Sequence, residues 1–180
     1  MTKLAIVSIV VGVASVAARL PGILSSGKFR EHMIQFPRSE VWGKVLIGIA
    51  ALVSWWVMFH AATDEWKWAQ PLVLVGVPAV FFLVINFAPH YLALRGMAAL
   101  MLMLAKVMLD AADISDAPLR LIVTVLAYLW VIAAIWMTVA PHHFRDLIGY
   151  IMANDKRCRH ACVAGIAVGV ALIALGLFAY

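Results

Sequence analysis

The chain has 180 residues, of which 66% are hydrophobic and only 13% are charged. A water-soluble domain is nearer to half apolar and a quarter charged, so the composition argues against an ordinary soluble domain and favours an integral membrane protein. The net charge of +5 therefore does not indicate nucleic-acid binding. The two cysteines are too few for a disulfide framework.

Six apolar stretches are long enough to cross a bilayer as helices, because about 20 residues span its hydrocarbon core. None of the polar segments between them is long enough to form a soluble domain. We therefore predict an all-α, polytopic membrane protein with a single transmembrane domain over residues 1–180. The predicted spans, in chain order, are residues 4–24, 41–61, 71–88, 91–109, 118–140 and 161–178.

The first apolar stretch also fits a second interpretation. Residues 1–18 combine Lys3, an apolar run and a small-residue segment, as a cleaved signal peptide does. Cleavage would leave the basic segment 19–44 outside the cell, although basic loops normally stay in the cytoplasm. We therefore expect a first transmembrane helix instead.

The distribution of charge predicts the orientation. Most of the 14 lysines and arginines fall in segments 19–44, 89–95 and 141–160, which lie on one side of a six-span protein. The positive-inside rule makes this side cytoplasmic and places both termini outside, and we expect the inner (plasma) membrane. The opposite side carries five acidic residues: Asp64, Glu65, Asp110, Asp113 and Asp116.

A polar segment before the last span has the pattern of an amphipathic helix. Its apolar residues recur every three or four positions, which puts them on one helix face. We expect a helix over residues 142–153 that lies in the cytoplasmic interface rather than crossing the membrane. The face consists of Phe144, Leu147, Ile148, Ile151 and Met152.

Consecutive spans are expected to form three helical hairpins, which pair spans 1–2, 3–4 and 5–6. Two similar triplets, Ala88-Pro89-His90 and Ala140-Pro141-His142, each end a span on the cytoplasmic side and suggest a parallel hairpin repeat. Coincidence is the alternative, since proline commonly ends helices and alanine is abundant here.

Histidines and cysteines gather on the cytoplasmic side and are the candidates for a metal site. Imidazole nitrogens and thiolates bind Zn²⁺ and softer metals, but a C-x₃-C spacing and adjacent histidines do not form the usual zinc motif. Interfacial histidines and small buried thiols explain the same residues, so no cofactor is strongly implied. The candidate ligands are His142, His143, Cys158, His160 and Cys162.

Two further patterns concern the spans themselves. Lys106 and Asp110 are four residues apart near the outer end of the fourth span, where they are expected to form an ion pair. No charged residue falls near the middle of a span, which weighs against a charge-driven pump. Gly165 and Gly169 form a small-residue face that favours close helix packing.

The sequence contains no strong catalytic motif, so we do not expect an enzyme. The leading hypothesis is a small accessory or scaffold subunit of a larger membrane complex, whose partners are the bilayer and other membrane subunits or a second copy. The alternative is an oligomeric small-solute channel or transporter, which needs a polar path through the spans. A membrane enzyme or metal-binding protein that uses these histidines and cysteines is the weakest of the three hypotheses.

Overall fold

The computed structural model describes residues 2–60, 70–87, 91–115, 117 and 119–180. These residues form α-helices and one short 3₁₀ turn, and the described ranges contain no strand, which confirms the all-α class. Five helices are long and apolar enough to cross a membrane, as expected of a multi-pass membrane protein. They are α1 (Lys3–Leu24), α3 (Glu40–His60), α5 (Leu92–Asp113), α6 (Arg120–Val139) and α8 (Asp155–Phe178).

The remaining helices are shorter. α4 (Gln70–Phe87) coincides with the third predicted span, and α7 (Pro141–Met152) coincides with the predicted amphipathic segment. The segment before α3, expected only to be polar and basic, forms α2 (Ser26–Gln35) and the turn η1 (Phe36–Arg38). Pro37 lies in that turn, in agreement with its role as a helix breaker.

Helix α8 begins six residues before the predicted span, at Asp155. The side chain of Asn154 accepts a hydrogen bond from the backbone N–H of Lys156 at 3.0 Å and so caps the helix. Asp155 lies in the first turn, where a negative charge favours helix formation. Hydropathy marks where a helix enters an apolar region, whereas capping marks where the helix starts.

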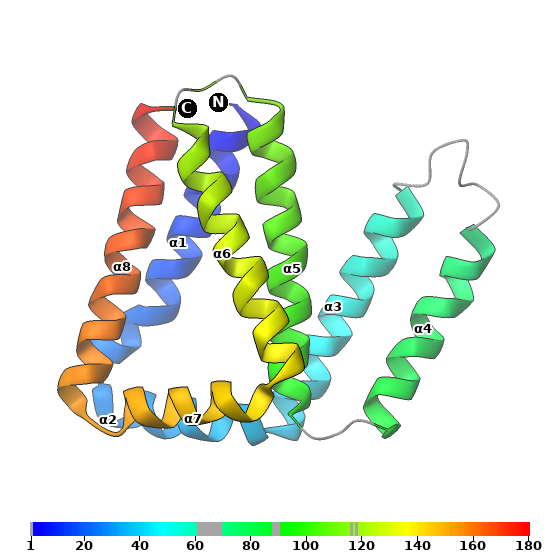
Figure 1. Cartoon of the computed structure of the whole chain (residues 1–180), viewed down its shortest axis with the longest axis horizontal. Helices are drawn as coiled ribbons and strands as arrows, with labels where there is room; N and C mark the ends of the chain where they lie inside the picture. Colours follow the sequence, from blue (N-terminus) through cyan, green and yellow to red (C-terminus); the bar gives the residue numbers. More distant parts are fainter. Residues whose placement is uncertain (1, 61–69, 88–90, 116, 118) are drawn as a thin grey trace.

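The spanning helices are arranged in a row of packed pairs. α1 packs mainly against α8, α5 packs against α6, and α3 packs against both α5 and α4 (Figure 1). A smaller contact between α1 and α5 joins the first pair to the rest. The first and last helices of the chain are therefore neighbours, and α4 lies at the far end of the row.

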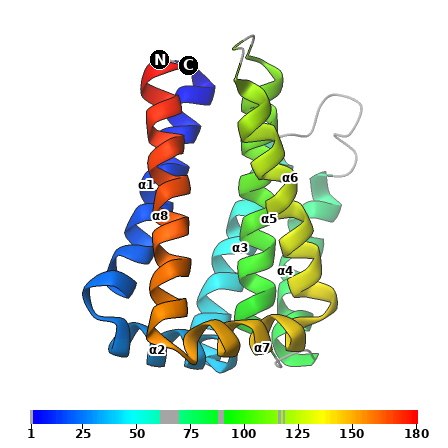
Figure 2. The same ribbon diagram turned by 60° about the vertical axis from the view of Figure 1, so that its left-hand side comes forward.

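Helices α2 and α7 explain why the spans expected to form the first and third hairpins, α1 with α3 and α6 with α8, are not packing partners. Both lie across the same end of the molecule, opposite the two termini (Figures 1 and 2). At about 1.5 Å per residue, α2 and α7 are about 15 and 18 Å long. Packed helix axes are only about 8–10 Å apart, so these helices separate α1 from α3 and α6 from α8. We call this end of the molecule the base.

The main apolar core lies in the half of the molecule nearest the termini. It joins α1, α5, α6 and α8 through buried side chains that include Leu4, Met108, Val123 and Leu172. The chain ends are linked there as well: Thr2 Oγ1 donates a hydrogen bond to the carbonyl of Tyr180 at 3.1 Å. The Tyr180 hydroxyl in turn donates to the carbonyl of Leu119 at 2.7 Å.

Candidate functional site

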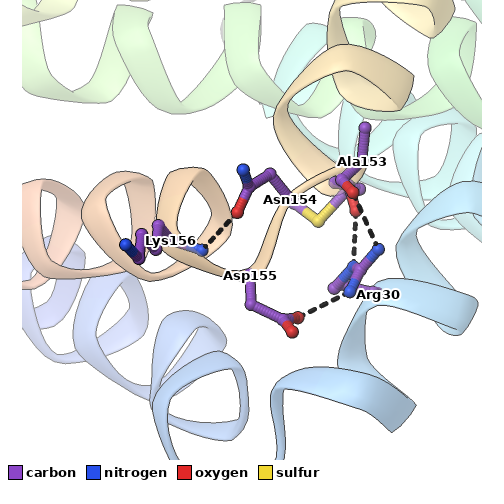
Figure 3. Close-up of polar contacts among 6 residues, drawn as sticks. Arg30, Ala153, Asn154, Asp155 and Lys156 are labelled. Atoms are coloured by element: carbon purple, nitrogen blue, oxygen red, sulfur yellow. Dashed lines mark hydrogen bonds and ion pairs between the residues drawn. The ribbon is translucent and has the colours of Figure 1, made fainter.

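One arginine links three helices at the base. Arg30 of α2 forms an ion pair with Asp155 of α8, with Nη1 2.5 Å from Oδ1 (Figure 3). Its Nε and Nη2 donate to the carbonyls of Met152 at 2.5 Å and Ala153 at 3.2 Å. Carbonyls at a helix C-terminus lack intrahelical donors, so the guanidinium also caps α7.

A sulfur-rich apolar cluster lies beside this arginine. Cys158 and Cys162 are buried with Met152 and pack against Phe29 and Met33 of α2. The end of α1 also reaches the cluster, since a Cβ on Gly22 would collide with the sulfur of Cys162. The cysteines therefore lie in a junction of four helices, where they act as small apolar side chains.

The predicted metal ligands fall into separate groups at the two ends of α7. His142 and His143 lie in the first turn of α7, with ring centroids 4.2 Å apart. Cys158 and Cys162 lie beyond the opposite end of that helix, and His160 is exposed on α8. Within the described residues, no group of three or more His, Cys, Asp or Glu side chains is placed to hold a metal ion.

A second arginine connects α7 to the start of α5. Arg145 donates from Nη1 to the hydroxyl of Tyr91 at 2.9 Å and binds Asp146 Oδ1 through Nε and Nη2. The hydrogen bond and charge of Asp146 raise the pKa of Arg145 above its ordinary value. Tyr91 has a φ of 58° in the left-handed region, which turns the chain sharply into α5.

The two predicted packing glycines face α1, but they meet different parts of it. A Cβ on Gly169 would lie 2.8 Å from the carbonyl oxygen of Gly12, so two helix backbones touch at this point. A Cβ on Gly165 would instead collide with the side chain of Arg19. Gly176 was not singled out from the sequence pattern, but it also lies close to α1. A Cβ on Gly176 would collide with the side chain of Ile9 and the carbonyl oxygen of Ala5.

The predicted intrahelical ion pair is present on α5. Lys106 Nζ lies 2.5 Å from Asp110 Oδ2, and both side chains are more than half exposed. Asp110 lies one turn from the end of α5, near the edge of the apolar region.

The guanidinium of Arg19 points back along α1, away from the base. Nη1 donates to the hydroxyl of Ser15 at 2.6 Å and to its carbonyl at 3.1 Å. The Ser15 hydroxyl donates across to the carbonyl of Gly165 at 3.2 Å. This network joins α1 and α8, and neither Arg19 nor Ser15 was singled out from the sequence as part of it.

Comparison with known proteins finds no matching family model, no similar curated protein and no similar solved structure.

Proposed function

We propose that the chain is an accessory or scaffold subunit of a larger complex in the inner membrane, with α4 as a docking helix for a membrane helix of another protein. In this proposal the chain has six spans, and α4 is the third of them. Its 18 residues extend over about 27 Å, close to the thickness of the hydrocarbon core.

The glycines of the spanning helices carry this proposal. In α1, α3, α5 and α8, every glycine but Gly48 lies where a neighbouring helix leaves no room for a side chain, as Gly43 does against Leu92. A Cβ on Gly48 would be in ordinary contact with Phe81 of α4, at 3.9 Å. Gly76 of α4, in contrast, has nothing within 4 Å of the position of a Cβ. Glycine weakens a helix and is favoured in membranes where helices approach closely, so the open Gly76 supports a missing partner helix.

The surroundings of Gly76 support the same conclusion. The extensive contacts of α4 within the described residues are with α3 alone. The α3-facing side of α4 includes Val77, Pro78 and Phe81, and helical periodicity puts Gly76 on the opposite side. Exposed apolar residues share that outward face: Leu72, Val80, Leu83 and Phe87.

The proposed topology places both termini outside and the base at the cytoplasmic interface. The positive-inside rule supports this orientation, because the base carries several lysines and arginines. They are Lys28 and Arg30 on α2, Arg145 on α7, and Lys156, Arg157 and Arg159 at the start of α8. α2 and α7 would lie parallel to the membrane, with the partly buried Phe144, Ile148 and Ile151 turned toward the bundle. The hydrogen bonds of Arg30 support a fixed base rather than two independent helices.

A native-membrane purification tests the proposal. The tagged chain is extracted in mild detergent, separated on a native gel, and the co-migrating proteins are quantified by mass spectrometry. We expect a stoichiometric partner with wild type and its loss with Gly76→Leu, which fills the open face. Gly149→Leu is the matched control, because Gly149 of α7 is equally open. A wild-type chain that migrates alone or only with itself contradicts the proposal, and solute-flux assays then test the channel alternative.

A further inference from the structure

Arg19 places a positive charge inside the apolar part of the molecule. It lies five residues before the end of α1, and its guanidinium reaches back to Ser15, away from the base. The guanidinium also lies against Gly165, which is ten residues beyond the start of α8. At about 1.5 Å per residue, that is about 15 Å along α8 from Asp155, which is tied to the base by Arg30.

The pocket for this side chain depends on Gly165. A Cβ there would overlap the Nε, Cδ and Cζ atoms of Arg19, so a larger residue would displace the guanidinium. Ser15 then fixes the guanidinium from the other side, since it accepts from Arg19 and donates to the Gly165 carbonyl. The arginine is therefore held in one orientation instead of extending to the membrane surface, as long basic side chains usually do.

The charge of Arg19 is only partly compensated. The hydrogen bonds that it makes within the described residues all start from Nη1. No carboxylate among those residues lies within ion-pair distance of it. The acidic residues of the spanning helices lie at helix ends: Glu40 begins α3, Asp110 and Asp113 end α5, and Asp155 begins α8.

We propose that Arg19 binds the carboxylate of an aspartate or glutamate in a membrane-spanning helix of the partner subunit. This helix is a different one from the helix that docks on α4, because α4 lies at the other end of the row. The inference rests on the proposed function, since it names the chemistry by which the partner is recognised. An ionised group at this depth is costly unless it is paired, and the Nε and Nη2 edge of a guanidinium matches a carboxylate. A second copy of the chain fits poorly, because its described spans carry no acid at this depth.

A lipid phosphate fits the depth poorly as well. If α2 and α7 lie at the headgroup boundary, phosphates lie near the level of the base, about 15 Å from the guanidinium by the helix geometry above. A carboxylate carried by a transmembrane helix can reach the same depth as Arg19. The geometry therefore favours a protein anion over a lipid anion.

Photo-cross-linking in native membranes tests which group lies next to Arg19. A photoreactive amino acid replaces Ala18 or Ala164, which are exposed residues next to Arg19 and Gly165 in sequence. We expect a cross-linked peptide from an apolar helix that contains Asp or Glu. The same amino acid at the exposed Leu129 of α6 is the control and should not yield that peptide. Cross-links to lipid alone, or to a helix without an acid, overturn the proposal.

Substitution of Arg19 gives the second measurement. Arg19→Met should lower recovery of the partner at least about tenfold, because the partner carboxylate is left unpaired in the membrane. Arg19→Lys, which keeps the charge, should retain more partner than Arg19→Met. Destabilisation of the chain itself by Arg19→Met would also lower recovery, so a second variant changes only the partner. In it, the cross-linked aspartate or glutamate of the partner is replaced by its amide, and recovery of the partner with the wild-type chain must fall. Full recovery with these variants overturns the role of Arg19 but leaves the subunit proposal standing, whereas a wild-type chain without a partner overturns both.

Discussion

Arg30 in α2 pairs with Asp155 in α8 across 125 residues of sequence, with Nη1 2.5 Å from Oδ1. The same guanidinium donates to the carbonyls of Met152 and Ala153, the last residue of α7 and its C-cap. One side chain therefore joins three helices at the base. The relative strengths of its contacts can be separated by substitution.

Arg30→Met should destabilise the protein more than Asp155→Asn. The ion pair is largely exposed on the Asp155 side, so its loss should cost less than about 1 kcal/mol. Arg30→Met also removes the hydrogen bonds to two carbonyls, which should raise the total to about 1–3 kcal/mol. Thermal unfolding in detergent, followed by intrinsic fluorescence, measures both variants. Equal losses would mean that the ion pair, rather than the capping of α7, provides the stabilisation.

The buried thiols provide a test of the same junction. Cys158 is fully buried and Cys162 is 3% exposed, so both should react slowly with a maleimide in the folded protein. Arg30→Met should increase the rate of labelling, because α2 then covers the cluster less firmly. Mass spectrometry of the labelled cysteines against time measures this rate. Fast labelling of the wild type would contradict the packing of Phe29 and Met33 over the thiols.

Gly169→Leu should be strongly destabilising, because its side chain would meet the carbonyl oxygen of Gly12 and the side chain of Val16. A backbone atom cannot move aside as a flexible side chain can, and overpacking typically costs about 1–3 kcal/mol. Gly27→Leu in α2 is the matched control, because a Cβ there has nothing within 4 Å. Thermal unfolding of both variants compares them, and similar melting temperatures would rule out close contact between α1 and α8.

Hydropathy predicted the spanning helices well because each is a long apolar run, but it did not predict how they pair. The segment that forms α2 is too polar for a span and too weakly periodic to stand out as a helix. Without α2, the first two spans look like a tight hairpin, whereas a helix of about 15 Å between them keeps them apart. The pairing of α1 with α8 therefore depends on two short helices of which only α7 was predicted.

The sequence also did not predict which candidate site residues lie close together in the fold. His142, His143 and the two cysteines are close in sequence, but α7 extends between them and holds the two groups apart. Gly165 was expected to allow two helix backbones to touch. In the structure, the side chain of Arg19 lies against Gly165 instead. Arg19 is 146 positions from Gly165, and no spacing rule relates residues that meet only through tertiary packing. The Ala88–His90 triplet of the suggested repeat lies outside the described residues.

The contact between Tyr180 and Leu119 predicts a dependence of stability on alkaline pH. Burial raises the pKa of the Tyr180 hydroxyl above its ordinary value, and the protonated hydroxyl donates to the Leu119 carbonyl. Because the folded-state pKa is the higher one, this contribution is complete below the ordinary tyrosine pKa of about 10 and is lost as the pH rises through the folded value.

Tyr180→Phe isolates this effect. At neutral pH the variant should be less stable than wild type by about 1 kcal/mol, which is typical of one hydrogen bond. The difference should shrink as the pH rises above about 10, since wild type then loses the same bond. Thermal unfolding at a series of pH values measures it. A difference that stays constant with pH would show that the hydroxyl contributes through packing and not through its proton.

The proposed orientation can be tested with two single-cysteine variants in a Cys158→Ser, Cys162→Ser background. Lys28→Cys lies on the exposed side of α2 at the base, and Asp113→Cys lies at the end of α5 that is nearest the termini. A membrane-impermeant maleimide on intact cells should label Asp113→Cys and spare Lys28→Cys, and permeabilised cells should label both. The reverse pattern would place the base outside, against the positive-inside rule. Since the orientation was inferred from the lysines and arginines near the base, that result would also remove the electrostatic argument for placing α2 and α7 on the cytoplasmic surface.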